Sequence, residues 1–95
     1  MTSNSSKKPV TVYGNTSCPY CGAARMLLTR KGVVFDDIIV TDNPSLLAEM
    51  LERSGRRTVP QILVGDTAVG GFDELSALDK SGELDEMLAG QLGGS

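Results

Sequence analysis

Hydrophobic and polar residues alternate with several different periods along this chain. Short runs of β-branched and aromatic residues predict strands, whereas apolar residues three or four positions apart predict helices. Prolines and glycines separate most of these segments. The pattern predicts strands over residues 10–13, 34–40, 61–64 and 67–69, and helices over residues 19–31, 44–54 and 73–88, the last with a break after Ser81.

The order of these elements predicts an α/β fold. The first strand, helix and second strand form a crossover, which places the two strands in parallel with a right-handed connection. Gly65-Asp66 is short enough to join the third and fourth strands as an antiparallel hairpin. We therefore expect a small four-stranded mixed sheet, built in the order β-α-β-α-β-β-α, with helices on both faces.

Length and composition indicate a single domain. The 95 residues can bury one modest core. We expect the domain to cover residues 9–90, after a flexible polar tail over residues 1–8 and before a frayed end over residues 91–95. The net charge of −3 gives no indication of a nucleic-acid or membrane partner. No apolar run approaches the ~20 residues of a membrane span, and the start lacks the apolar core of a secretory signal, so we expect a cytoplasmic protein.

The stretch N-T-S-C-P-Y-C-G contains the only two cysteines of the chain, Cys18 and Cys21. A disulfide that served only as a structural link between them would close too short a loop to constrain the unfolded chain, and such disulfides are rare in the cytoplasm. A zinc site needs four ligands, whereas the chain has two thiols and no histidine, so we expect no metal site. These observations favour a redox couple.

The position of Cys18 supports this interpretation. Pro19 suits the first position of a helix, so Cys18 occupies the N-cap, where its sulfur can accept hydrogen bonds from the N–H groups of Tyr20 and Cys21. The positive end of the helix dipole also favours a thiolate, and both effects lower a thiol pKa. Cys21 is expected to face inward and to keep its proton longer. Cys18 then attacks a disulfide, and Cys21 resolves the mixed disulfide that forms.

Two further segments are candidates for a binding site. Thr58-Val59-Pro60 precedes the third strand, either with an ordinary trans proline or with a cis proline that presents the backbone of Val59 beside Cys18. In Gly70-Gly71-Phe72-Asp73-Glu74, a glycine turn leads into a helix that Asp73 is expected to cap. Such a helix start can bind a carboxylate, and the two acids beside it can pair with an ammonium group. The second segment therefore suits an amino acid or a peptide.

Together these three segments resemble the active-site motifs of the glutaredoxins. C-P-Y-C at residues 18–21, T-V-P at 58–60 and G-G-F-D at 70–73 match the small bacterial-type dithiol members in order and spacing, and the resemblance extends from Val10 to Leu88. It implies a thioredoxin-like fold and a glutathione-dependent thiol–disulfide oxidoreductase, which reduces protein disulfides and glutathione mixed disulfides. Glutathione is then a co-substrate, no cofactor is permanently bound, and the protein partners are disulfide-bonded or glutathionylated. Because no dimer surface is evident, we expect a monomer.

The resemblance also implies a role for each site residue. Cys18 and Cys21 are catalytic, and the cysteinyl part of glutathione pairs with the backbone of Val59, which a cis Pro60 holds. Tyr20 and Thr58 flank this part of the ligand. The residues expected to meet the γ-glutamyl end are Gly71, Phe72, Asp73 and Glu74.

Asn15 departs from the family pattern, because many members carry a lysine there that favours the thiolate and binds the glycine carboxylate of glutathione. Arg56 or Arg57 is a candidate replacement for that charge. Two other functions stay open at this point. One is a dimer in which two Cys18 thiolates and two glutathiones hold a 2Fe–2S cluster. The other is a redoxin that a thioredoxin reductase reduces in place of glutathione.

Overall fold

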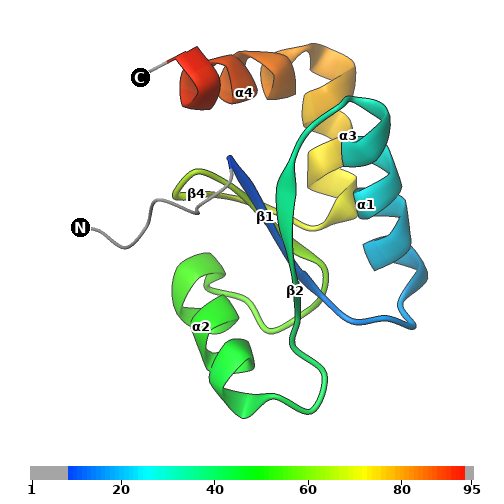
Figure 1. Ribbon diagram of the computed structural model, residues 1–95, viewed down its shortest axis with the longest axis vertical. Coiled ribbons are helices and arrows are strands. Elements are labelled where there is room, and N and C mark those ends of the chain that lie inside the picture. The colour runs from blue at the N-terminus through cyan, green and yellow to red at the C-terminus, as the bar shows by residue number, and fades with distance from the viewer. Residues whose placement is uncertain (1–8, 94–95) are drawn as a thin grey trace.

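The computed structural model describes the chain from Pro9 to Gly93. The predicted tail over residues 1–8 lies outside the described residues, as do residues 94 and 95 of the predicted frayed end. A four-stranded sheet is surrounded by four helices (Figure 1). The strands are β1 (Val10–Gly14), β2 (Phe35–Ile39), β3 (Gln61–Val64) and β4 (Thr67–Gly70), and the helices are α1 (Pro19–Arg30), α2 (Pro44–Ser54), α3 (Phe72–Ser81) and α4 (Glu83–Gly93).

The sheet has the mixed topology that the sequence predicts. Its strand order is β2-β1-β3-β4. β1 pairs in parallel with β2, where Val10 lies opposite Phe35, and antiparallel with β3, where Val10 lies opposite Val64. β3 and β4 form the predicted antiparallel hairpin. The expectation of a small mixed sheet with helices on both faces is confirmed, and the fold is thioredoxin-like.

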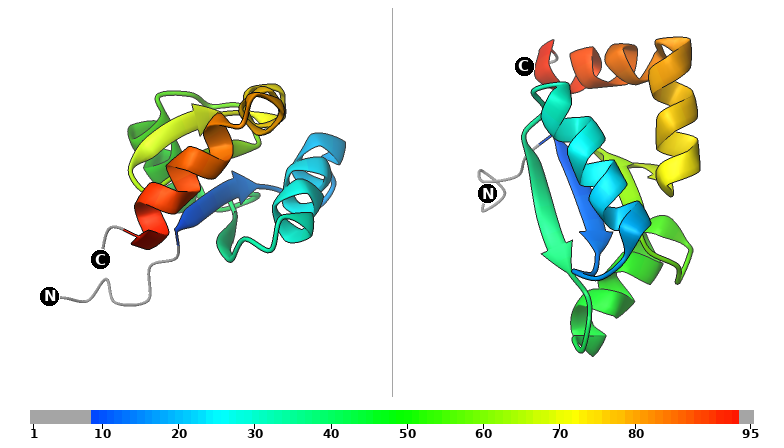
Figure 2. Two further views of the ribbon diagram at one scale, coloured as in Figure 1. Left: turned by 90° about the horizontal axis from the view of Figure 1, so that it is seen from above. Right: turned by 90° about the vertical axis from the view of Figure 1, so that its right-hand side faces the viewer.

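Each face of the sheet has its own apolar core. Alternate residues of a strand point to opposite faces, so Val12 and Ile62 pack toward α1, α3 and α4, whereas Tyr13 and Leu63 pack toward Met50 of α2. Figure 1 shows α2 on one side of the sheet and α1 and α3 on the other. In Figure 2, α4 runs from the end of α3 across one end of the sheet. None of the helices in the described part of the chain is long and apolar enough to cross a membrane.

The signals that mark α2 in the sequence have the expected structural roles. The side chain of Asn43 accepts a hydrogen bond from the N–H of Leu46 at 3.1 Å, and Pro44 occupies the first turn. Gly55 ends the helix with a left-handed backbone conformation at φ = 77°, which glycine adopts at little cost. On the opposite side of the sheet, Arg30 ends α1 just before Gly32.

The C-terminal helical region has the predicted break and differs from the prediction in detail. The break after Ser81 is confirmed, because Gly82 adopts a left-handed conformation at φ = 87° and separates α3 from α4. The expectation that Asp73 caps α3 is wrong, because the helix begins one residue earlier and Gly71 is its N-cap. α4 continues to Gly93, so residues 91–93 of the segment predicted to fray are helical. Strand β2 is also shorter than predicted and excludes Val34, which is exposed.

Candidate active site

Cys18 and Cys21 lie at the start of α1, at the point where the chain leaves β1. Cys18 is the N-cap with extended backbone angles (φ −86°, ψ 122°), and proline follows it in the first turn. Both cysteines are free thiols. Cys18 is partly exposed, whereas Cys21 is completely buried. The predicted division into an accessible and an inward-facing cysteine is confirmed.

The environment of Cys18 favours its thiolate. Its pKa is lowered, chiefly by the backbone N–H of Cys21 and further by the Cys21 thiol, the N–H of Tyr20 and the positive charge of Arg25, against an opposing effect of burial. The two N–H groups among these causes, those of Tyr20 and Cys21, are the two that the sequence predicts to face the Cys18 sulfur, although neither makes a capping hydrogen bond of full geometry. The N–H groups therefore act on the sulfur through their partial charges at the positive end of the helix dipole.

Cys21 has the opposite tendency. Burial raises the pKa of its thiol most strongly. The backbone of Asn15 lowers this pKa, the neighbouring Cys18 raises it, and the positive charge of Arg25 has the smallest, lowering effect. Gly14, at the end of β1, makes this burial possible. A Cβ atom at Gly14 would lie only 2.8 Å from the sulfur of Cys21, so a side chain there would displace the thiol. No pattern in the sequence singles out Gly14.

Arg25 is a second residue that the sequence analysis missed. Its Nη2 donates to the backbone oxygen of Asn15 at 2.9 Å, and its Nε donates to Oδ1 of Asp37 on β2 at 3.0 Å. The guanidinium group therefore links α1 to the loop before Cys18 and places a positive charge near both thiols. Its one sequence signal is helical spacing, since Arg25 lies four residues after Cys21 and so on the same helix face.

Asn15 shapes the same loop. Its side-chain oxygen accepts a hydrogen bond from the N–H of Ser17 at 3.1 Å. It contributes no charge, so the positive charge that acts on Cys18 comes from Arg25 on α1.

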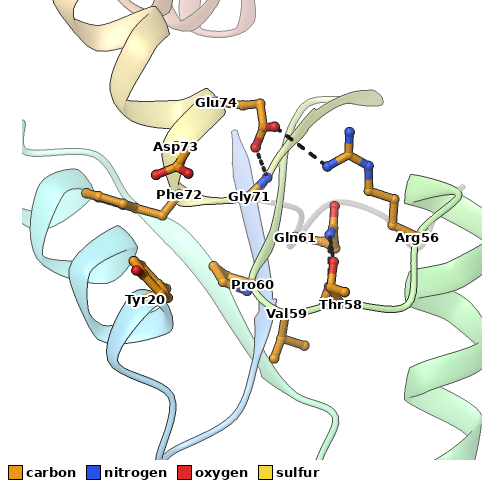
Figure 3. A pocket seen from close by; sticks show the side chains of 10 residues that line it. All are labelled: Tyr20, Arg56, Thr58, Val59, Pro60, Gln61, Gly71, Phe72, Asp73 and Glu74. Atoms are coloured by element: carbon orange, nitrogen blue, oxygen red, sulfur yellow. Dashed lines mark hydrogen bonds and ion pairs between the residues drawn. The ribbon is translucent and has the colours of Figure 1, made fainter.

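A pocket of about 270 Å³ lies beside the first turn of α1. Figure 3 shows side chains from three regions of the chain that converge on it: the start of α1, the segment before β3, and the start of α3. All eight residues predicted to bind glutathione line this one pocket. The complete lining is Tyr20, Arg56, Thr58, Val59, Pro60, Gln61, Gly71, Phe72, Asp73 and Glu74.

The segment before β3 has the cis proline that the sequence left open. The Val59–Pro60 peptide bond is cis. Within the described residues, neither the N–H nor the C=O of Val59 is hydrogen-bonded to another part of the chain. A backbone N–H or C=O group that lies at a pocket and has no internal partner can pair with the backbone of a bound peptide.

The opposite wall of the pocket is formed by the N-terminus of α3. Oε1 of Glu74 accepts a hydrogen bond from the N–H of Gly71 at 2.8 Å, and this bond is the main reason that the pKa of Glu74 is lowered. Nη1 of Arg56 lies 3.7 Å from Oε2 of the same carboxylate. The rings of Tyr20 and Phe72, which both line the pocket, lie near each other with centroids 6.3 Å apart.

The two arginine candidates differ in position. Arg56 lines the pocket, whereas Arg57 lies with Pro44 and Leu47 in a separate surface hollow beside α2. Gln61 also lines the pocket, although the sequence analysis treated it only as part of a strand. Within the described residues, no cluster of three or more cysteine, aspartate or glutamate residues forms a metal site.

A thioredoxin-like sheet with a Cys-X-X-Cys pair at the start of its first helix defines a thiol–disulfide oxidoreductase. Comparison with known proteins gives the family. The family model described as Glutaredoxin matches residues 10–69. The glutaredoxin of Pseudomonas aeruginosa is 48% identical over 81 residues, which are 85% of this chain and 96% of that protein. Glutaredoxin 3 of Escherichia coli K12 is 46% identical over 79 residues, which are 83% of this chain and 95% of that protein. The chain belongs to the glutaredoxin family.

Solved structures agree with this assignment. The buckwheat glutaredoxin–glutathione complex superimposes with a TM-score of 0.80 at 29% identity, covering 88% of this chain and 79% of that one. The solution structure of glutaredoxin from Brucella melitensis gives a TM-score of 0.73 at 48% identity, covering 90% and 94% of the two chains.

Proposed function

We propose that this protein is a glutathione-dependent oxidoreductase that reduces protein disulfides and glutathione mixed disulfides. The observation that carries this proposal is the convergence of all eight predicted ligand residues on one pocket beside the first turn of α1. We also propose that the protein is a cytoplasmic monomer without a permanently bound cofactor, and that its protein substrates are disulfide-bonded or glutathionylated.

The pocket offers a suitable partner to each part of glutathione. Its cysteinyl peptide groups pair with the free N–H and C=O of Val59. Its γ-glutamyl carboxylate accepts hydrogen bonds at the start of α3, and its ammonium group lies near Asp73 and Glu74. Arg56 is the cation available for the glycine carboxylate. The structurally similar buckwheat glutaredoxin has been solved as its glutathione complex, which supports this assignment.

Reduction of a glutathione mixed disulfide needs only Cys18. Its thiolate attacks the glutathione sulfur, the bond between that sulfur and the protein sulfur breaks, and the protein thiolate leaves and takes a proton. The thiolate of a second glutathione then attacks the glutathione sulfur bound to Cys18. This step releases glutathione disulfide and restores the Cys18 thiolate. The lowered pKa of Cys18 makes it both an available nucleophile and a good leaving group.

Reduction of a protein disulfide uses both cysteines. Cys18 attacks one sulfur of the substrate and forms a mixed disulfide, while the other substrate sulfur leaves as a thiolate. Cys21 then loses its proton and attacks the sulfur of Cys18, which releases the reduced substrate and leaves a Cys18–Cys21 disulfide. Two glutathione molecules reduce this disulfide in two exchange steps and leave as glutathione disulfide.

A coupled assay with two electron donors tests the proposed function. The reduced protein is given a glutathionylated peptide with either glutathione, glutathione reductase and NADPH, or thioredoxin reductase and NADPH. We expect turnover with the glutathione system and little with the flavoprotein alone. Turnover only with thioredoxin reductase would contradict the proposal, as would a folded protein that is inactive with both donors.

A further inference from the structure

Gln61 is a buried polar residue that lies directly behind the segment expected to bind glutathione. It is the first residue of β3, and only 1% of it is exposed. Its Nε2 donates to the backbone oxygen of Thr58 at 2.8 Å and to the Thr58 hydroxyl at 3.1 Å. Figure 3 shows these two side chains next to each other in the lining of the pocket.

The other end of the Gln61 amide has no partner. Its Oε1 is buried without a hydrogen bond to the described chain. A buried polar group without a partner destabilises the folded state, and an apolar side chain would fill the same space without this cost. Filling the core therefore does not account for a glutamine at this position. The two hydrogen bonds to Thr58 are the interactions that require it.

These hydrogen bonds determine the orientation of a peptide group that the proposed mechanism uses. The backbone oxygen of Thr58 and the N–H of Val59 belong to one rigid peptide unit. That unit is trans, because the one cis bond of the described chain follows Val59. In a trans peptide unit the oxygen and the N–H point in opposite directions. By holding the Thr58 oxygen, Gln61 directs the N–H of Val59 away from the interior.

We propose that Gln61 is a positioning residue, which holds the Thr58–Val59 peptide unit ready to pair with the peptide backbone of a disulfide substrate. The proposal rests on the function proposed above. Gln61 acts through Thr58 and does not contact either sulfur. It therefore selects for disulfides that carry peptide groups near the sulfur, such as glutathione disulfide, and it leaves the intrinsic reactivity of Cys18 unchanged.

Two disulfides of different structure test this inference. The reduced protein is mixed with glutathione disulfide or with bis(2-hydroxyethyl) disulfide, which has no peptide groups, and the oxidation rate constant is measured for each. In Gln61→Met, the side chain keeps about the same length but cannot donate to Thr58. We expect the rate constant with glutathione disulfide to fall about tenfold, which is a typical effect of losing one hydrogen bond, here the bond from the N–H of Val59 to the substrate. The rate constant with bis(2-hydroxyethyl) disulfide should stay within about twofold of the wild-type value. This disulfide has no peptide group that could pair with the backbone of Val59, so the orientation of that backbone does not affect its reaction.

Two measurements separate positioning from a general loss of stability. Val64→Ala, three residues further along β3, removes core volume on the side of α1 and α3 and does not touch Thr58. This control should lower stability without changing the ratio of the two rate constants. The pH dependence of thiolate absorbance should be the same in wild type and in Gln61→Met. Gln61→Leu removes the same donor and replaces Gln61→Met if that variant does not fold.

The same measurements distinguish failure of the proposed function from failure of the role proposed for Gln61. A wild-type protein that does not prefer glutathione disulfide would contradict the glutathione function itself, and the inference with it. A wild-type preference that persists unchanged in Gln61→Met would overturn the inference alone. An equal loss of rate with both disulfides would also overturn it, because it would show that Gln61 supports the fold or the reactive cysteine and not recognition of the substrate.

Discussion

Cys18 and Cys21 carry the same thiol group three residues apart, yet the fold gives them opposite properties. Cys18 is partly exposed at a helix N-terminus, and nearby N–H groups lower its pKa. Cys21 is buried against Gly14, and burial raises its pKa. Cys18 is therefore the better suited of the two to attack a disulfide as a thiolate, and Cys21 is suited to remain a thiol until a mixed disulfide forms.

This difference predicts the pH dependence of alkylation. The pKa of Cys18 is lowered, so its thiolate persists at pH values where an ordinary thiol is protonated, and its reactivity is lost only when the pH falls below that lowered pKa. Cys21, with a raised pKa, should react only at higher pH. Iodoacetamide labelling across a pH series, with each cysteine quantified by mass spectrometry, measures both profiles. Similar profiles for the two cysteines would contradict the assignment of roles.

Arg25 should contribute to the Cys18 profile. Arg25→Gln removes a positive charge near both thiols, so the Cys18 profile should move to higher pH. Arg30→Gln is the matched control, because it removes the same charge from the exposed last residue of the same helix. If the two variants shift the profile equally, the local position of Arg25 has no particular importance.

At the scale of elements, the sequence predicts the ends of a helix well where a single residue caps or terminates that helix through its own chemistry. Asn43, Pro44 and Gly55 mark the ends of α2 because each acts through its own side chain or backbone freedom. The start of α3 was predicted at the wrong residue, because its cap is Gly71, which has no side chain to signal a cap. The sequence signal for this helix start is Glu74, which lies three residues after the cap and whose side chain accepts a hydrogen bond from the Gly71 N–H.

The contact between β1 and α1 predicts the effect of a small substitution. Gly14→Ala places a Cβ 2.8 Å from the sulfur of Cys21, so the end of β1 and the start of α1 must move apart. Such overpacking typically costs about 1–3 kcal/mol in the free energy of unfolding. Urea unfolding of the reduced protein measures this change.

Gly22→Ala is the matched control for this substitution. Gly22 lies in α1, and a Cβ there meets no atom within 4 Å. Alanine is favoured over glycine in a helix by about 1 kcal/mol, so this variant should be more stable than wild type. Destabilisation by Gly22→Ala, or none by Gly14→Ala, would contradict the packing described between the strand and the helix.

At the scale of the whole molecule, the site joins three segments that are far apart in the sequence. Their motifs allowed the pocket lining to be predicted, because together they resemble the glutaredoxin motifs, and that resemblance implies a ligand role for each residue. Arg25 and Gln61 could not be predicted in this way. Their residue types are ordinary for a helix and a strand, and their importance depends on Asn15 and Thr58, which only the folded chain brings into contact with them.

The two neighbouring arginines give a matched test of the pocket. Arg56 lines it and lies 3.7 Å from Glu74, whereas Arg57 lies beside α2. Arg56→Gln should therefore raise the glutathione concentration needed for half-maximal turnover by about twofold to fivefold, the effect of losing an exposed ion pair that contributes up to about 1 kcal/mol. Arg57→Gln should have little effect. Equal effects of the two substitutions would show that the position of Arg56 has no particular importance, and no effect of either would show that its charge is not used to bind glutathione.

The central claim is that Cys18 alone performs exchange with glutathione, while Cys21 is needed only for protein disulfides. The most direct test compares wild type, Cys18→Ser and Cys21→Ser, with glutathione, glutathione reductase and NADPH. One substrate is a glutathionylated peptide and the other is a protein disulfide. We expect Cys18→Ser to be inactive on both, and Cys21→Ser to retain most activity on the peptide and to lose activity on the protein. Equal loss of both activities in a folded Cys21→Ser protein would contradict the assignment of the two cysteines.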